Sequence, residues 1–233
     1  MSRLLFWNVQ RLGAGTDNVV RNGLIEIARR YRSDFNIFCE LTPQCPYPKA
    51  INYAHVRNKD DQLCFGFMGS DLSDQAGLAE EYVPVITDEF RDAHFKGGAN
   101  FRAFSSRGVV RLKNFGGLDV LAFHAPGGNG LKAVSYVIAS LNETYGRKPW
   151  LLVGDLNVEP KVLKESKISL QIADWIKPPD DITYRNKGSN GFWTGKEYDY
   201  AVANIAAPVT VTVTPDTRAM EKLSDHLPII VEW

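Results

Sequence analysis

Short apolar runs bounded by polar or turn-forming residues recur along the whole chain. Each run has the length of a β-strand, and several, such as LLV at 151–153, carry no polar position, which is typical of strands buried on both faces. The pattern predicts at least nine strands, at residues 3–9, 35–41, 63–69, 107–112, 118–125, 149–157, 198–204, 208–214 and 227–233.

Two segments, residues 20–31 and 131–145, instead repeat apolar residues at intervals of three and four. That spacing puts the apolar side chains on one face of an amphipathic helix, and this face has to be buried. Gly146 suits the C-terminal cap of the second helix, and Pro149 follows it as expected beyond a helix end.

Helices set between groups of very apolar strands indicate two packed sheets with helices outside them. No linker divides the 233 residues, so we expect one domain spanning residues 1–233. Residues 70–106 are the least regular stretch, and residues 96–108 read as a surface loop placed to touch substrate. Its segment NFRAFSSR suits stacking on bases and an ordinary folded loop equally well.

Composition and charge limit the class of protein. With 27 Lys and Arg against 27 Asp and Glu, the net charge is zero, so any polyanion must be met by a local patch. No apolar run is long enough to span a membrane. The start, MSRLLFWNVQ, turns polar too soon for a secretory signal, which predicts a cytoplasmic protein or a mature chain whose leader has been removed. Cys39, Cys45 and Cys64 lack zinc-site spacing and are expected to be free structural thiols.

Polar side chains follow the apolar strands where the backbone leaves the core. Taken singly, Asn8 and Asn157 suit a turn as well as a site, and an isolated histidine is usually structural. Glu40 is harder to explain, because a buried unpaired carboxylate is costly. Six separated segments deliver such groups, which favours one shared site over independent turns. The full set is Asn8, Glu40, His124, Asp155, Asn157, Asp199, Asp225 and His226.

The motifs that carry these side chains resemble the signature segments of the endonuclease/exonuclease/phosphatase (DNase I-like) superfamily. The segments LLVGDLNV, SDHLPI and YDYAVAN, the Asn of LLFWNVQ and the Glu of NIFCEL occur in the order and spacing of that family, over residues 3–233. The resemblance implies a four-layer α-β-β-α sandwich of two largely antiparallel sheets. It also implies phosphodiester hydrolysis at one sheet edge with Mg²⁺, Mn²⁺ or Ca²⁺.

Within that superfamily, AFHAPGGNGLKAVSYVIASLN and SSRGVV are similar to pancreatic-type DNase I and to the nuclease subunit of cytolethal distending toxin. The similarity implies a general base assisted by a carboxylate, a second histidine at the leaving group and a carboxylate and amide metal site. The similarity implies that His226 is the general base, that Asp199 orients it, and that His124 is a general acid or phosphate donor paired with Asp60 or Asp61. It implies that Asp155 and Asn157 position the water and the phosphate and that Arg107 contacts the phosphate. The implied metal-binding residues are Glu40, Asn8 and Asp225.

The chain departs from DNase I where that enzyme enters the DNA groove. Leu41 and Thr42 follow Glu40 in place of an arginine, and Lys59 stands near the position of a tyrosine. We therefore carry two functions forward: a monomeric Mg²⁺-dependent DNA endonuclease, and a phosphatase or phosphodiesterase acting on a small molecule or a phospholipid or inositol head group. A non-catalytic binding module is a third, disfavoured because every site position keeps a competent residue. Residues 184–197 form a candidate substrate-facing loop that includes Trp193.

Overall fold

Strands alternate with a few helices in the computed structural model, which describes residues 1–9, 18–41, 51–52, 64–71, 73–166, 172–187, 193–214 and 224–233. The strands are β1 (Arg3–Asn8), β2 (Phe35–Leu41), β3 (Ile51–Asn52), β4 (Cys64–Gly69), β5 (Ala79–Tyr82), β6 (Val109–Phe115), β7 (Leu118–Phe123), β8 (Trp150–Asp155), β9 (Ile176–Lys177), β10 (Tyr184–Lys187), β11 (Trp193–Lys196), β12 (Asp199–Asn204), β13 (Thr210–Val213) and β14 (Ile229–Glu232). The helices are α1 (Asn18–Tyr31), α2 (Asp88–His94), α3 (Phe101–Phe104), α4 (Gly130–Tyr145) and α5 (Pro160–Glu165), with 3₁₀ turns at Ala76–Leu78, Lys96–Gly98 and Ala173–Trp175.

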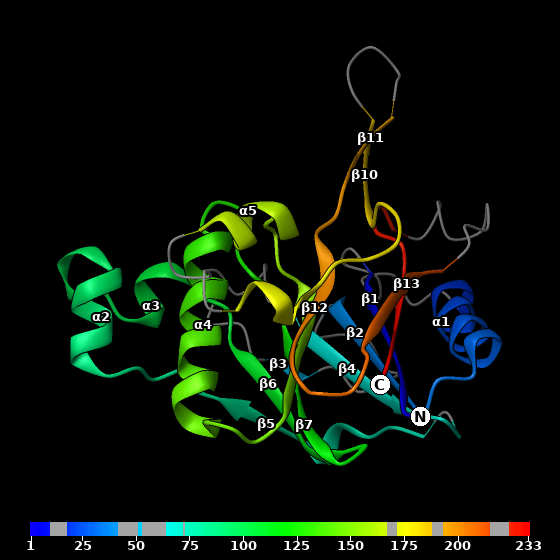
Figure 1. The fold of residues 1–233 in the computed structure, drawn as a ribbon. Coiled ribbons are helices and arrows are strands. Elements are labelled where there is room, and N and C mark those ends of the chain that lie inside the picture. The colour runs from blue at the N-terminus through cyan, green and yellow to red at the C-terminus, as the bar shows by residue number, and fades with distance from the viewer. Residues whose placement is uncertain are drawn as a thin grey trace.

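Two six-stranded sheets form the centre of the molecule. The first sheet has the order β13-β14-β1-β2-β4-β3 and the second β5-β6-β7-β8-β12-β9. Each contains one parallel pair, β1 with β2 and β7 with β8, and its other pairs are antiparallel. Helices α4 and α5 cover the second sheet and α1 covers the first (Figure 1). The predicted four-layer DNase I-like sandwich is confirmed.

Strand β1 shows why the strands lack a polar face. Leu4 and Phe6 point into the apolar layer between the two sheets, whereas Leu5 and Trp7 belong to the cluster under α1, and all four are fully buried. A third apolar cluster fills the space between the second sheet and α4. Since burying each large side chain contributes roughly 1.5–3 kcal/mol, both faces of the strand hold the layers together.

The stretch at 70–106 is more regular than predicted. It contains β5, α2 and α3, and Thr87 caps the N-terminus of α2, because its side chain accepts a hydrogen bond from the Phe90 backbone amide. The expectation that residues 96–108 form a surface loop is wrong for Phe101, which is buried with its ring 5.9 Å from that of Tyr136 on α4. This aromatic covers α4 and is not available for stacking on a base. Helices of four and seven residues are too short to show a helical period.

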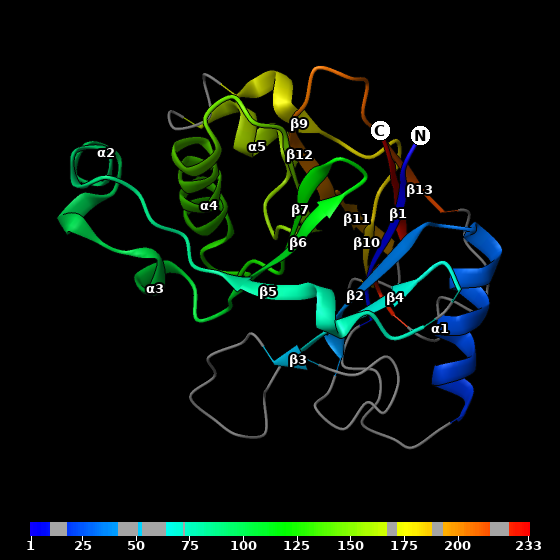
Figure 2. The same cartoon turned by 90° about the horizontal axis from the view of Figure 1, so that it is seen from below.

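The remaining elements agree with the sequence except at the edges. All nine predicted strands and both predicted helices are present, whereas the short strands β3, β5, β9, β10 and β11 were not predicted. Strands β10 and β11 pair as a separate hairpin that projects from the sandwich (Figure 1). Seen from below, α4 and α1 lie on opposite sides of the molecule with the sheets between them (Figure 2). Cys39 and Cys64 are both buried, and Cys39 is a free thiol, as predicted, whereas Cys45 lies outside the described residues. Among the helices of the described segments, none has the length and apolar character needed to cross a membrane.

Candidate active site

The topology brings the polar strand ends to one edge of the sandwich. Strands β1 and β2 run parallel and end near Asn8 and Glu40, while β7 and β8 run parallel and end before His124 and at Asp155. Strand β12 runs against β8 and begins at the same edge, with Asp199 opposite Asp155 in register. Side chains from both sheets therefore meet although they are far apart in sequence.

Hydrogen bonds fix the two sheets to each other at this edge. The side-chain nitrogen Nδ2 of Asn8, in the first sheet, donates a hydrogen bond of 2.8 Å to Oδ2 of Asp155, in the second sheet. The Ser224 hydroxyl donates to the Asn8 carbonyl at 2.7 Å and accepts from the His226 amide at 3.0 Å. The Trp7 indole donates to the His226 carbonyl at 2.9 Å. The segment before β14 is thereby held against β1, and His226 is placed over the site.

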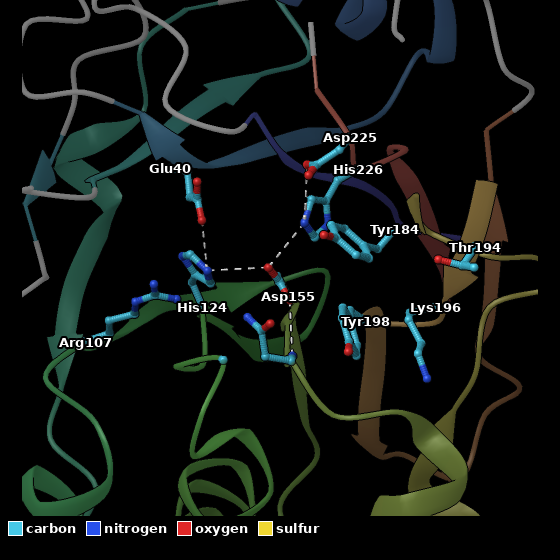
Figure 3. Close-up of a pocket in the computed structure, with 12 residues that line it drawn as sticks. Glu40, Arg107, His124, Asp155, Tyr184, Thr194, Lys196, Tyr198, Asp225 and His226 are labelled. Atoms are coloured by element: carbon cyan, nitrogen blue, oxygen red, sulfur yellow. Dashed lines mark hydrogen bonds and ion pairs between the residues drawn. The ribbon is translucent and has the colours of Figure 1, made fainter. Parts of the chain in front are cut away.

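Five titratable side chains form a continuous chain across the edge, and Figure 3 shows its part from Glu40 through His124 and Asp155 to His226. Nδ1 of His226 lies 2.7 Å from Oδ2 of Asp199, and Nε2 of His226 lies 3.7 Å from Oδ2 of Asp155. On the other side, Nε2 of His124 lies 3.4 Å from the same Asp155 oxygen and 3.2 Å from Oε1 of Glu40. Asp155 is thus the central residue of the chain, with one histidine and one further carboxylate on each side.

Backbone strain aims two of the side chains. Glu40 has a φ of 58°, where the register between β2 and β4 shifts between Phe38 and Leu41, so an irregularity in the strand turns this carboxylate toward the site. Asn157 has a φ of 48°, and its amide nitrogen donates to the Ala125 carbonyl at 2.8 Å. Positive φ in residues other than glycine costs free energy and is concentrated at functional sites.

Gly154 allows β7 and β8 to approach each other below the site. A Cβ atom on this residue would lie 1.8 Å from the Phe123 carbonyl oxygen, closer than any real contact. The residue after this glycine is Asp155 and the residue after Phe123 is His124, so the close approach sets the separation of those two side chains. The glycine of the GDLN segment is explained by this packing.

Burial and neighbouring charges shift the pKa values of the two histidines in opposite directions. Burial lowers the pKa of His124 well below its usual value, and the charges of Arg107 and His226 lower it further. Burial also opposes charge on His226, yet Asp199, and after it Asp155 and Asp225, outweigh burial and raise the His226 pKa to about 10. Without a bound cation, His226 is therefore the charged imidazole and His124 the neutral one.

The central carboxylate is strongly perturbed. Burial and then the charge of Asp199 raise the pKa of Asp155 to about 7, against the lowering effect of His226 and of the Asn8 hydrogen bond. Two groups among the described residues bring candidate ligand atoms within 4.8 Å of one another: Glu40 with His124 and Asp155, and Asp155 with Asp199 and His226. Asp155 belongs to both groups, so its carboxylate is the common member of any cation site here.

A pocket of about 560 Å³ opens over this chain of residues. It is lined by Glu40, Arg107, His124, Gly127, Asp155, Asn157, Tyr184, Thr194, Lys196, Tyr198, Asp225 and His226. Arg107 is anchored by a 2.8 Å hydrogen bond from Nη1 to the Ala125 carbonyl, the same oxygen that Asn157 contacts. Arg107, which the resemblance implies as a phosphate contact, thus lies at the pocket.

Every residue of the predicted site within the described segments lies at this edge. Seven line the pocket, whereas Asn8 and Asp199 are buried behind it and bond to Asp155 and His226. The candidate substrate-facing segment 184–197 forms β10 and β11, where it is described, rather than a loop, and it contributes Tyr184, Thr194 and Lys196 to the pocket. Sequence reasoning missed Tyr198, for which the alternation of Thr194, Lys196 and Tyr198 along the chain was the available signal. Four other residues of the prediction, Thr42, Lys59, Asp60 and Asp61, lie outside the described residues, as does the Trp193 side chain.

Several solved structures match this fold over nearly the whole length of the chain. A conserved protein of unknown function from Enterococcus faecalis V583 matches with a TM-score of 0.62 at 13% identity, over 99% of this chain and 98% of that one. The Haemophilus ducreyi cytolethal distending toxin matches with a TM-score of 0.61 at 15% identity, over 99% and 97%. An endonuclease/exonuclease/phosphatase family protein from Leptotrichia buccalis C-1013-b matches with a TM-score of 0.59 at 15% identity, over 100% and 99%.

Comparison with protein-family models gave no match, and neither did comparison with curated protein sequences. The chain nevertheless has the fold of the endonuclease/exonuclease/phosphatase, or DNase I-like, superfamily. The resemblance predicted from its motifs is therefore confirmed at the level of the fold.

Proposed function

We propose that the protein is a divalent-metal-dependent phosphodiester hydrolase, and that its substrate is DNA, cut internally. The observation that supports this proposal most is the continuous chain from Glu40 through His124, Asp155 and His226 to Asp199, which combines candidate cation ligands with an imidazole–carboxylate pair in one pocket. Hydrolysis of a phosphodiester needs both, because the anionic centre repels hydroxide and the leaving alkoxide is basic.

The residues present suit a hard divalent cation. Glu40 and Asp155 offer carboxylate oxygens of the kind Mg²⁺, Mn²⁺ and Ca²⁺ bind. Burial, and after it the negative charge of Asp199, raises the pKa of Asp155, and a cation would relieve that negative charge. Asp225 adds a carboxylate 3.8 Å from Nε2 of His226, and Asn8 holds Asp155 in place. A cation bound there supplies Lewis-acid stabilisation of the charge on the reacting phosphate.

His226 is the proposed general base. Its Nδ1 is tied to Asp199, which fixes the ring and stabilises the imidazolium, so that Nε2 faces the pocket and can take a proton from water. Asp155 contributes to the high pKa of His226. Neutralising the Asp155 carboxylate therefore lowers that pKa toward the range in which an imidazole accepts a proton at neutral pH.

The other pocket residues are assigned to the phosphate and the leaving group. Arg107, beside His124, suits a nonbridging oxygen, because a guanidinium offers paired donors. Asn157, fixed through the Ala125 carbonyl, positions the phosphate together with Asp155. His124, the neutral imidazole of the site, serves the leaving oxygen as a hydrogen-bond donor through the one ring nitrogen that carries a proton.

A substrate panel tests the proposal. Supercoiled plasmid, single-stranded DNA, RNA, bis(p-nitrophenyl) phosphate and phosphoinositides are each incubated with the protein in Mg²⁺ and in EDTA. We expect nicking of plasmid, cleavage of single-stranded DNA and hydrolysis of bis(p-nitrophenyl) phosphate, each in Mg²⁺ only. Inactivity on every phosphodiester, or activity that survives EDTA, contradicts the proposal.

A second candidate is a phosphatase or phosphodiesterase for a small molecule or a phospholipid or inositol head group. The balanced net charge favours it over a nucleic-acid enzyme, and a pocket of about 560 Å³ has the size of a small-ligand site. Phosphate release from phosphoinositides with plasmid and oligonucleotides left intact selects this candidate.

A further inference from the structure

Three polar side chains stand in a row along one wall of the pocket. Thr194, Lys196 and Tyr198 occupy alternate positions and all line the pocket, so they share one face of the extended chain, about 7 Å apart from one to the next. From β10, Tyr184 pairs with Lys196 in register, and its ring lies 5.4 Å from that of Tyr198. Strand β11, which carries Thr194 and Lys196, runs along the hairpin that projects from the edge of the sandwich (Figure 1).

The two cationic side chains of the pocket lie on opposite sides of the acidic centre. In Figure 3, Arg107 stands beside His124 on one side, whereas Lys196 stands beyond Tyr198 on the other. Arg107 is placed to contact the reacting phosphate, as proposed above. A cation on the far side of Asp155 has no role at that same phosphate, and its position suits a second anionic group of the substrate.

Lys196 is held ready by a carboxylate outside the catalytic chain. Its ammonium lies 2.7 Å from Oε2 of Glu159, the residue before α5, and both side chains are partly exposed. Glu159 raises the pKa of Lys196, so the ammonium stays charged. Exposed ion pairs of this kind contribute little to stability, so the lysine can exchange Glu159 for a phosphate at small cost.

We propose that the wall of Thr194, Lys196 and Tyr198 binds the sugar–phosphate backbone one phosphate beyond the scissile bond, and that Lys196 leaves Glu159 to contact that phosphate. The substrate is then a nucleic-acid strand running from Arg107 over Asp155 to the hairpin, and not a small phosphodiester. This inference rests on the proposed function, whose DNA assignment it extends to the path of the strand.

The test compares two lysine–glutamate pairs. Lys113 also lies 2.7 Å from a glutamate oxygen, of Glu80, but is not part of the pocket, so Lys113→Gln is the matched control for Lys196→Gln. The readout is kcat/KM in Mg²⁺ for a labelled 20-nucleotide single strand between 50 and 200 mM salt. We expect Lys196→Gln to reduce the slope of log kcat/KM against log salt by about 0.7, the value for one single-strand phosphate contact. Lys113→Gln keeps the wild-type slope, and Lys196→Arg retains most of it.

Each other outcome is decisive. Equal slopes for Lys196→Gln and Lys113→Gln overturn the inference. So does a loss on bis(p-nitrophenyl) phosphate as large as that on the strand, because Lys196 then acts at the scissile group. In both cases the Mg²⁺-dependent activity of the wild type leaves the proposed function standing. A wild-type protein inactive on all phosphodiesters refutes the proposed function, and the inference with it.

Discussion

At the scale of single residues, the site is governed by competition between burial and charge at three carboxylates and two imidazoles. The contact between Nδ1 of His226 and Oδ2 of Asp199, at 2.7 Å, is the shortest between members of the chain across the edge. Asp199 is also the first cause that raises the pKa of His226 against burial. The orientation of the proposed base and its proton affinity thus depend on one neighbour.

Replacing Asp199 by Asn tests this dependence. The amide keeps the shape but removes the charge, so the imidazolium formed during proton transfer loses its partner, and we expect kcat to fall by about 10²- to 10⁴-fold. Asp119→Asn is the matched control, because Asp119 accepts a hydrogen bond from Tyr145 away from the pocket. Steady-state kinetics on bis(p-nitrophenyl) phosphate measure both, and similar rates for the two variants contradict the role of Asp199.

Asp155 makes a stability prediction that depends on pH. An unfolded aspartate ionises near pH 3.9, whereas the folded pKa is about 7, so the folded protein holds this proton more tightly and loses stability as pH rises between those values. In EDTA, Asp155→Asn should therefore be more stable than the wild type at pH 8, on the order of 2 kcal/mol, with the difference vanishing below pH 4. Thermal unfolding at both pH values measures it.

Added Mg²⁺ supplies the control for the same variant. A cation that binds the folded wild type raises its unfolding temperature, and the Asn variant should gain less because it lacks the shared carboxylate. If the wild type is more stable than Asp155→Asn at pH 8 in EDTA, the ionised Asp155 carboxylate does not destabilise the folded protein, which contradicts the prediction.

At the scale of elements, the site depends on how closely β7 and β8 pack. Gly154→Ala places a methyl group against the Phe123 carbonyl, a backbone atom that cannot rotate away, so the strands must separate. We expect a loss of about 3 kcal/mol in the free energy of unfolding. Gly128→Ala, where no atom lies within 4 Å of the added carbon, should change it by less than about 0.5 kcal/mol. Urea denaturation of both variants checks the contrast.

The sequence predicted the elements that carry their own periodic signal. Long apolar runs gave the central strands, and regular apolar spacing gave α1 and α4, whereas α2, α3 and the edge strands are too short for a period to be visible. Phe101 looked like a surface aromatic because nothing local shows that α4 needs a cover. Tertiary packing decides such positions.

The site was predictable in composition but not in detail. The strand-end motifs identified the residues that now meet around Asp155, because parallel strands bring their ends to one edge. The positive φ of Glu40 and the neutral state of His124 depend on neighbours distant in sequence, and no local pattern reports them.

At the scale of the whole molecule, a net charge of zero is compatible with binding an anionic substrate only if the cations are concentrated at the pocket. With a net charge of zero, long-range attraction of a polyanion is weak, so binding has to come from the cations around the pocket. Arg107 and Lys196 provide these on either side of an acidic centre that a divalent ion would neutralise. The fold supplies the framework, because the two sheets each deliver part of the centre.

The proposal that His226 is the general base of a metal-dependent phosphodiester hydrolase is tested most directly by one rate. This is the rate of bis(p-nitrophenyl) phosphate hydrolysis in Mg²⁺ by the wild type, by His226→Ala and by His94→Ala. His94 lies on α2 and contacts Phe90, away from the pocket, which makes it the matched histidine control. If His226 is the general base, hydrolysis is EDTA-sensitive, falls at least about 10²-fold in His226→Ala and stays at the wild-type rate in His94→Ala. Equal rates for the two variants, or a wild-type rate that EDTA leaves unchanged, would contradict the proposal.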